Sequence, residues 1–264
     1  TDKQDNVRKG YKRLCEIWKK AEWLDKTVYT NFADIHKITP FNSFLKYNMP
    51  VMSRKPVLYL SLDEGQGTTA HDLSEYQNHG TIYGATWQKL KTGKNALYCD
   101  GVDDRVEVPD SPSLDIQEAI SAFCWIKAPS EQEQDYVAVF GKHEAYGLRV
   151  RAGGKPNLSV LLYKPDGSGW TYINSNYDVL DSMWHLIGFT YDLNKVKIFV
   201  DGNEIYSKDY SNTIHVSDYP LVIGGLTGTS LLYKGYITHV SIYNRTLSES
   251  EIKKIYETTK VLFD

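Results

Sequence analysis

The spacing of apolar residues changes near residue 56. Before that point, Val7, Tyr11 and Leu14 recur at steps of four and three residues, which is the spacing of an amphipathic helix. Similar stripes between residues 24 and 45 predict two further short helices. We therefore expect residues 1–50 to form a small helical segment.

From Val57 onward the apolar and polar residues alternate with period two, in short runs separated by Gly, Asp and Asn. The expected strands are 57–62, 96–99, 105–108, 120–127, 136–142, 146–151, 157–163, 170–174, 185–192, 195–201, 221–224 and 235–243. A dozen strands at this spacing predict a mainly β fold. We expect a two-sheet antiparallel β-sandwich, a jelly roll, over residues 57–264, with residues 51–56 as the linker.

Turn and cap signals refine this picture. Asp192 to Lys195 and the pair Asp201-Gly202 are typical of hairpin turns. The sequence Ser248-Glu-Ser-Glu251 is a capping box and predicts a C-terminal helix that caps the sandwich.

Composition narrows the class of protein. The hydrophobic fraction is 41%, enough for a sizeable core, and the net charge is −3 without any long block of one sign. Such a charge pattern does not predict nucleic-acid binding, and no apolar run is long enough to span a membrane. The sequence begins at Thr1 without a signal peptide, so we interpret it as a fragment of a longer protein, with neighbouring modules as partners.

The three cysteines, Cys15, Cys99 and Cys124, are an odd number at irregular spacing. Cys99 and Cys124 each lie among strand-like apolar residues, where reduced thiols pack as small hydrophobic groups. A disulfide between these two is the alternative.

Seven motifs follow one another along the β region. They are Val57 to Thr69, Asp72 to Gly80, Tyr98 to Gly101, Asp110 to Ile126, Trp184 to Ile187, Lys197 to Gly202 and Gly235 to Ile252. In this order they resemble the laminin-G-like jelly rolls of the concanavalin A-like lectin/glucanase superfamily, over roughly residues 57–257. The resemblance implies the jelly-roll fold found in many extracellular and virion proteins. More faintly, the N-terminal helices resemble helical units of phage and archaeal virus structural proteins.

The resemblance also implies calcium, which many relatives hold between the first loop and the last strand. By matched position the ligands are Asp72 and Asn78, with Glu64 and Asp100 as further candidates. Thr238 stands where many relatives carry Asp, and losing a carboxylate weakens a calcium site. The alternative is that Asp72 and Asn78 are ordinary turn residues.

Catalysis is not predicted. Glycosidases on this fold carry a Glu-x-Asp-x-x-Glu strand that sets two carboxylates about 5.5 Å apart, and that spacing does not occur. The nearest acidic cluster, Asp100, Asp103, Asp104 and Glu107, is typical of a turn and of the solvated face of a strand. Two glycosylation sequons, at Asn157 and Asn244, fall on predicted strands and are interpreted as coincidence.

Residues 164–177 are the best candidate for a carbohydrate surface. Trp170 and Tyr172 alternate on one face, with Asp166 and Asn174 as polar neighbours. The alternative is that both rings fill the core.

The sequence thus favours a non-catalytic binding or adhesion module for a glycan or protein on a cell or particle surface, in an extracellular or virion protein. A structural spacer without ligand is the second hypothesis, and a glycoside hydrolase is the third.

Overall fold

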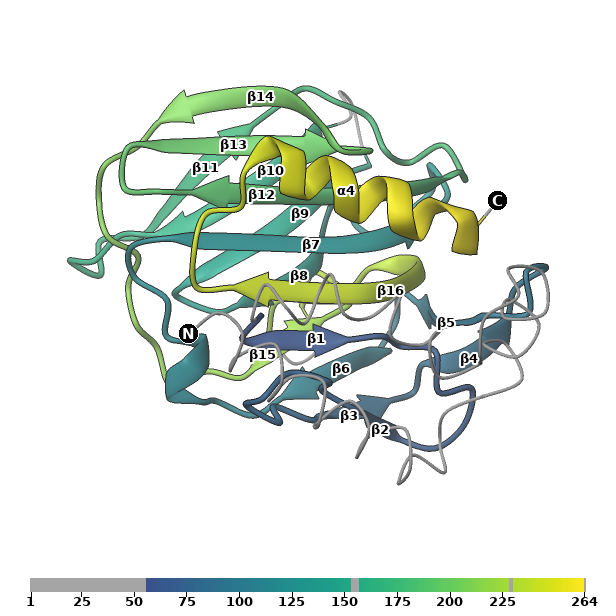
Figure 1. The fold of residues 1–264 in the computed structure, drawn as a ribbon. Helices are drawn as coiled ribbons and strands as arrows, with labels where there is room; N and C mark the ends of the chain where they lie inside the picture. Colours follow the sequence, from purple (N-terminus) through teal and green to yellow (C-terminus); the bar gives the residue numbers. More distant parts are fainter. Residues whose placement is uncertain (1–55, 153–156, 228–229, 264) are drawn as a thin grey trace, which may run out of the picture.

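The computed structural model describes residues 56–152, 157–227 and 230–263, which form two antiparallel sheets of eight strands each (Figure 1). The predicted mainly β sandwich is confirmed. The helical segment expected at residues 1–50, together with residues 51–55 of the linker, lies outside the described residues.

Sheet A has the strand order β14-β13-β12-β7-β16-β5-β4, and β1 also pairs with β16. Its strands are β1 (Leu58–Leu60), β4 (Thr86–Lys89), β5 (Asn95–Asp100), β7 (Ile120–Lys127), β12 (Trp184–Tyr191), β13 (Lys195–Val200), β14 (Asn203–Asp209) and β16 (Lys234–Tyr243). All of its pairings are antiparallel.

Sheet B has the order β11-β10-β9-β8-β15-β6-β3-β2. Its strands are β2 (Thr69–Ala70), β3 (Gly80–Tyr83), β6 (Arg105–Val108), β8 (Tyr136–Lys142), β9 (Tyr146–Arg151), β10 (Asn157–Tyr163), β11 (Trp170–Asn174) and β15 (Leu221–Ile223). A short 3-10 helix, η1 (Pro112–Leu114), lies between β6 and β7.

The main core lies between the two sheets and follows the period-two pattern. In sheet B, Leu148 and Val150 of β9 and Leu158 and Val160 of β10 are fully or almost fully buried in this core. The residues that alternate with them point away from it, because successive side chains of a strand lie on opposite faces. The outer face of sheet B is therefore formed by the remaining residues of these strands.

The outer face of sheet A is covered by helix α4 (Glu249–Thr259), which crosses in front of it in Figure 1. Trp125 of β7 stacks on Tyr256 at 5.7 Å between ring centroids and donates a hydrogen bond from Nε1 to Thr259 Oγ1 at 2.8 Å. The predicted capping box is present, with Ser248 as the N-cap and Glu251 as its partner. This helix ends in the 3-10 helix η2 (Lys260–Leu262).

Four strands were not expected from the sequence: β2, β3, β4 and β14. Three of them, β2, β4 and β14, lie at sheet edges. Strands β4 and β14 contain no buried residue, so the alternation that marks a half-buried strand does not develop in them. Strand β2 has only two residues.

The predicted turn at Asp201-Gly202 joins β13 to β14, and both residues have positive φ, 53° and 77°. Such a backbone suits the two-residue hairpin turn, and glycine adopts it without strain.

Cys99 and Cys124 are buried and free, so the alternative of a disulfide between them is wrong. No helix within the described ranges has the length and apolar character needed to cross a bilayer.

Candidate functional site

The outer face of sheet B brings together three of the four predicted ligand-binding residues. Ile173 of β11 is buried in the main core. Its neighbours in alternation, Trp170, Tyr172 and Asn174, therefore lie on the outer face. Tyr172 keeps 43% of its surface exposed, and Asn174 is exposed as well.

Trp170 is half-buried on this face, not part of the main core. Its ring meets Tyr163 edge-on at 5.0 Å and His143 at 6.0 Å. It also packs against a small cluster of Ala138, Leu161 and Leu226. Leu226 belongs to the loop after β15. Trp170 therefore packs between this loop and the outer face of sheet B.

That loop can lie on the sheet because the strands beneath it carry glycines. A Cβ atom added to Gly141 of β8 would come within 2.4 Å of Leu226 Cδ1. The neighbouring residue across the pair, Gly147 of β9, adds no side chain either. The loop closes one side of the outer face and leaves Tyr172 exposed on the other.

Asp166, the fourth predicted residue, lies in the turn between β10 and β11, before Trp170 in the chain. Its Oδ1 accepts a hydrogen bond from the Ser168 backbone N–H at 2.9 Å, and hydrogen bonds from Ser168 hold the pKa of this carboxyl below its ordinary value. Asp166 therefore supports the turn and stands apart from Tyr172 and Asn174.

Three further residues complete the outer face and were not singled out from the sequence. Tyr136 of β8 and the pair Arg149 and Arg151 of β9 alternate with core residues. The guanidinium carbon of Arg149 lies 4.4 Å from the ring centroid of Tyr136 and 4.2 Å from that of Tyr172. The alternation of Arg149 and Arg151 with Leu148 and Val150 was the signal that could have found them.

The predicted calcium ligands do not form one set. The Asp72 carboxylate organises its own loop, because Oδ1 accepts hydrogen bonds from the backbone of Tyr59 and Ser74, both at 2.8 Å. Its Oδ2 accepts from Ser74 Oγ at 2.6 Å and from the backbone N–H of Asn78 at 2.8 Å. Asn78 donates its amide hydrogens to Val57 O and Ser113 Oγ. Both oxygens of Asp72 are thus already hydrogen-bonded twice.

Asp100 lies far from this loop. Asp100 pairs with Lys234 of β16, whereas Asp72 bridges Leu60, which pairs with Val240 of the same strand. Six residues of a strand span about 20 Å.

Glu64 is buried, with Oε1 accepting from the His71 backbone and Oε2 without a hydrogen-bond partner. Thr238 donates its hydroxyl hydrogen to Ser61 O at 2.7 Å, which ties β16 to the segment after β1. These contacts do not fit one calcium ion held by Asp72, Asn78, Glu64 and Asp100, and calcium binding by the protein stays a prediction.

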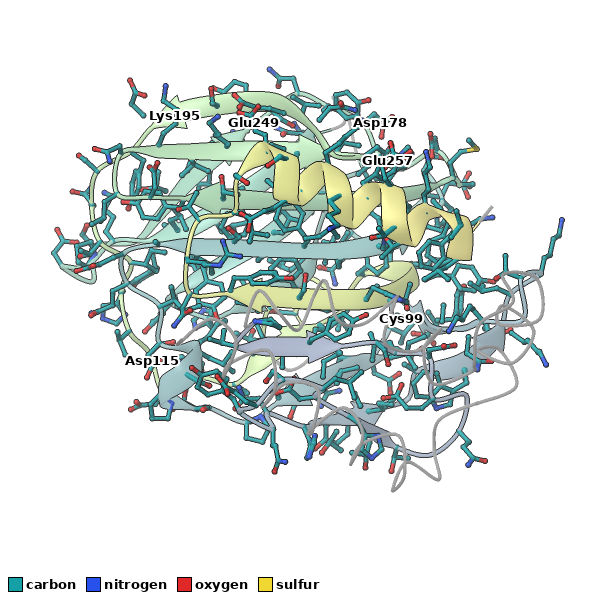
Figure 2. All side chains as sticks on the ribbon, in the orientation of Figure 1. Cys99, Asp115, Asp178, Lys195, Glu249 and Glu257 are labelled. Carbon is teal, nitrogen blue, oxygen red and sulfur yellow. The ribbon has the colours of Figure 1, made fainter. Side chains whose placement is uncertain are left out.

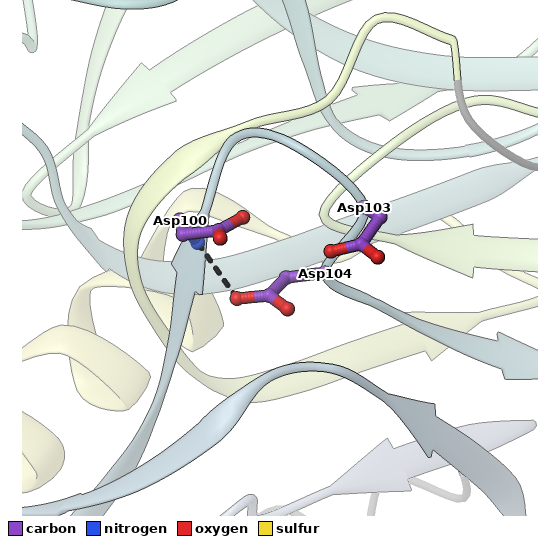
Figure 3. A group of neighbouring side chains, drawn as sticks. All are labelled: Asp100, Asp103 and Asp104. Atoms are coloured by element: carbon purple, nitrogen blue, oxygen red, sulfur yellow. Dashed lines mark hydrogen bonds between the residues drawn. The ribbon is translucent and has the colours of Figure 1, made fainter.

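Asp100, Asp103 and Asp104 gather at the turn between β5 and β6 (Figure 3). Asp104 Oδ2 accepts a hydrogen bond from the Asp100 backbone N–H at 2.8 Å, and Asp100 Oδ1 accepts from Val102 N–H at 2.8 Å. Burial raises the pKa of Asp104, and the nearby carboxylates of Asp100 and Asp103 add to the shift. Each of these hydrogen bonds serves the turn.

A hollow of about 720 Å³ lies at η1 and is lined by residues that include Tyr76, Asp115, Glu118 and Asn244. Asp115, on the side of the molecule away from Glu257 in Figure 2, accepts a hydrogen bond from the buried Lys142 ammonium at 2.8 Å.

Asn244 of the second sequon was expected within a strand; it lies in the exposed bend after β16 instead, so that expectation is wrong. Strand β16 ends at Tyr243, the residue before Asn244.

The chain belongs to the concanavalin A-like lectin/glucanases superfamily, whose family model matches residues 100–253. No curated protein matches the sequence. Several solved structures share its fold.

One of these structures is the binding domain of Paraclostridial Mosquitocidal Protein 1, with a TM-score of 0.63 and 15% identity over 76% of this chain and 52% of that one. A second is domain 4 of AbnA, an extracellular arabinanase from Geobacillus stearothermophilus, in complex with arabinotriose, with a TM-score of 0.60 and 19% identity over 76% and 98%.

A third is the ligand binding domain of botulinum neurotoxin serotype D in complex with N-acetylneuraminic acid, with a TM-score of 0.62 and 16% identity over 79% and 52%. The chain thus spans about half the length of the two toxin domains and nearly all of the arabinanase domain. At these identities the likeness concerns the fold.

Proposed function

We propose that this chain is a non-catalytic carbohydrate-binding module and that the outer face of sheet B is its binding surface. The observation that carries the proposal is the exposed ring of Tyr172, which lies beside hydrogen-bonding groups on a sheet face that α4 does not cover. Aromatic rings stack on the C–H faces of sugars, and neighbouring polar groups bind their hydroxyls.

The polar groups next to Tyr172 are already positioned. Ser159 donates its hydroxyl hydrogen to Asn174 Oδ1 at 2.8 Å, which orients the exposed Asn174 amide with its NH₂ group available. Positioned groups lose less conformational entropy on binding than free ones. Two solved structures with this fold are complexes with sugars, one with arabinotriose and one with N-acetylneuraminic acid, which supports the proposal.

A non-catalytic role is supported by the charges of this face. Glycoside hydrolysis needs two carboxylates on either side of the scissile bond. The strands β8, β9, β10 and β11 contain no Asp or Glu within their described lengths. We place such a module in a larger surface protein, next to other modules of the same chain.

Replacing Tyr172 with Ala tests the proposal. A glycan array with the 264-residue chain identifies a ligand, and calorimetry then compares the variants. We expect Tyr172→Ala to weaken binding about fivefold or more, since one stacked ring contributes about 1–3 kcal/mol, the value known from nucleobase stacking. Tyr76→Ala is the matched control, because Tyr76 is 44% exposed and lies at the η1 hollow.

If Tyr76→Ala abolishes binding and Tyr172→Ala does not, the sugar site lies in the η1 hollow and the proposed surface is wrong. If no glycan binds, the chain is a spacer and the proposed function fails.

A further inference from the structure

The inference concerns the kind of sugar that the outer face of sheet B takes, and it rests on the proposed function. Strand register sets Arg149 opposite Ser159 of β10, which in turn is opposite Asn174 of β11. In the neighbouring row of paired residues, on the side of the loop that carries Leu226, Leu161 is opposite both Gly147 and Tyr172. Arg149 therefore lies in one row with two polar side chains and beside an exposed ring.

Two aromatic rings hold the Arg149 guanidinium in place. Its central carbon lies within 4.5 Å of the ring centroids of both Tyr136 and Tyr172, and the guanidinium of Arg151 lies 5.1 Å from the Tyr136 ring. Such cation–π contacts fix an arginine without neutralising it. The result is a pair of positively charged groups from one strand on one face.

The part of the chain that the structure describes supplies no carboxylate to this pair. Within the described residues neither arginine lies within ion-pair distance of a carboxylate, and the four strands β8 to β11 carry no acidic residue. The Nε atoms of both arginines are buried without a hydrogen-bond partner. Burial also lowers the pKa of Arg149, so its charge is less well solvated than that of a free side chain. Arg149 and Arg151 remain partly exposed, so an anion on this face would pair with the accessible part of each guanidinium.

Arg105 of β6, on the same sheet, is a comparison case in which an arginine over a tyrosine ring has a carboxylate partner. It also lies over a tyrosine ring, that of Tyr83, at 4.5 Å. Its Nε, however, donates to Glu107 Oε1 at 2.7 Å, and a second donor reaches Asp103 O. Among the described residues, two tyrosine-bound arginines, Arg105 and Arg245, have a carboxylate partner, whereas Arg149 and Arg151 have none.

We propose that the outer face of sheet B binds an acidic glycan, with Arg149 and Arg151 holding the carboxylate or sulfate of one sugar residue and Tyr172 stacking on the ring of that residue or the next. Guanidinium groups bind oxyanions through paired N–H donors in a fixed planar geometry, which suits both anionic groups. Asn174 is close enough in the same row to bind a hydroxyl of the same sugar.

The experiment compares three trisaccharides that differ in charge: trigalacturonic acid, a neutral galactose trisaccharide and a sulfated galactose trisaccharide. Calorimetry with the 264-residue chain measures each Kd. We expect the carboxylated or the sulfated sugar to bind at least tenfold more tightly than the neutral one, and the better of the two identifies the anionic group. Affinity for the acidic sugar falls as salt rises from 50 to 500 mM, because the contact is electrostatic.

The variants separate charge from folding. Arg149→Gln with Arg151→Gln removes the preference for the acidic sugar, whereas Arg105→Gln leaves it unchanged. Arg149→Lys keeps the charge but loses the planar pair of donors, so we expect a partial loss. Thermal melting of each variant shows whether it folds, and Arg149→Lys alone keeps the test valid if the double variant does not fold.

Each other outcome has a defined meaning. Equal binding of the neutral and acidic sugars overturns this inference and leaves the proposed function standing. An unchanged acidic preference in a folded Arg149, Arg151 variant also overturns it, as does a glutamate-rich peptide that binds more tightly than every sugar. Absence of binding to any glycan overturns the proposed function itself.

Discussion

Asp72 shows how one carboxylate can fix the shape of a loop. It accepts four hydrogen bonds from residues as far apart as Tyr59 and Asn78, and it is buried. A buried anion is tolerated only when donors of this kind satisfy it, since an unpaired buried charge is costly. The backbone of β1 is thereby joined to the loop that follows β2.

We expect Asp72→Ala to lower the free energy of unfolding by about 3 kcal/mol, because four donors lose their acceptor and hydrogen bonds to charged groups contribute roughly 1.5–3 kcal/mol each before compensation by water. Urea denaturation followed by tryptophan fluorescence measures the loss. Asp178→Ala is the control, because Asp178 is exposed and accepts one hydrogen bond, from Leu180 N–H at 2.9 Å. A loss below 1 kcal/mol for Asp72→Ala, or a melting temperature that falls with EDTA in the parent and not in this variant, contradicts the hydrogen-bonding role and favours calcium.

At the residue scale the sequence placed Trp170 and Tyr172 on one strand face from alternation and named Asn174 as a polar neighbour. It did not identify Arg149 and Arg151, although they alternate as clearly. Alternation tells which side chains share a face, but not whether that face is covered by another part of the chain. The rings that hold Arg149 come from two different strands, and only the register shows that they meet at this guanidinium.

The hairpin of β13 and β14 is tied to β12 by His185. His185 Nδ1 lies 2.8 Å from Asp201 Oδ2 in the hairpin turn, and Nε2 lies 3.2 Å from Asp181. The hydrogen bond with Asp201, the hydrogen bond with Asp181 and the charges of both acids raise the pKa of His185, against an opposing effect of burial. The protonated imidazole is thus the form that the fold favours.

This shift makes stability depend on pH in a defined direction. Because the pKa is higher in the folded than in the unfolded chain, the contribution is complete below the unfolded value of about 6.5 and is lost as pH rises through the raised value. We expect the contribution of His185 to the free energy of unfolding to fall by about 1 kcal/mol between pH 5.5 and pH 8.5.

His185→Gln flattens that part of the pH profile, measured by urea denaturation across the range. The control is His215→Gln, because His215 Nδ1 lies 2.9 Å from the backbone carbonyl of Glu144 and pairs with no acid among the described residues. A profile that stays as steep in His185→Gln as in the parent would show that other groups set the pH dependence.

At the element scale the sequence predicted the long central strands and α4, because a buried element shows its period most clearly. Strand β7 is buried over seven of its eight residues and was predicted with its observed bounds. The edge strands β4 and β14 were not predicted, because their pairing with a neighbour holds them in place and their side chains carry little burial signal.

For the molecule as a whole, the two sheets have different outer faces. The α4 side of sheet A buries Trp125, Leu186 and Phe199 under the helix, while β8 to β11 of sheet B present tyrosines and arginines. The binding that we propose on sheet B therefore does not need to displace the helix. The family motifs predicted the sandwich, but motifs that specify the core carry no information about a surface that differs among relatives.

The buried thiols of Cys99 on β5 and Cys124 on β7 can report whether a ligand on the outer face of sheet B stabilises the folded core. Both thiols are buried in the core, and burial raises the pKa of each thiol, so little thiolate is present to react. In a Cys15→Ser background, we expect both to react with a thiol reagent only when the sandwich opens. Ligand binding to the folded state lowers the open fraction by a factor of 1 + [L]/Kd, so an acidic glycan at ten times its Kd slows labelling about tenfold. The same glycan concentration slows labelling at most about twofold in the Arg149→Gln, Arg151→Gln variant, whose Kd is at least tenfold higher. Rapid labelling of the native chain would show instead that the core opens locally.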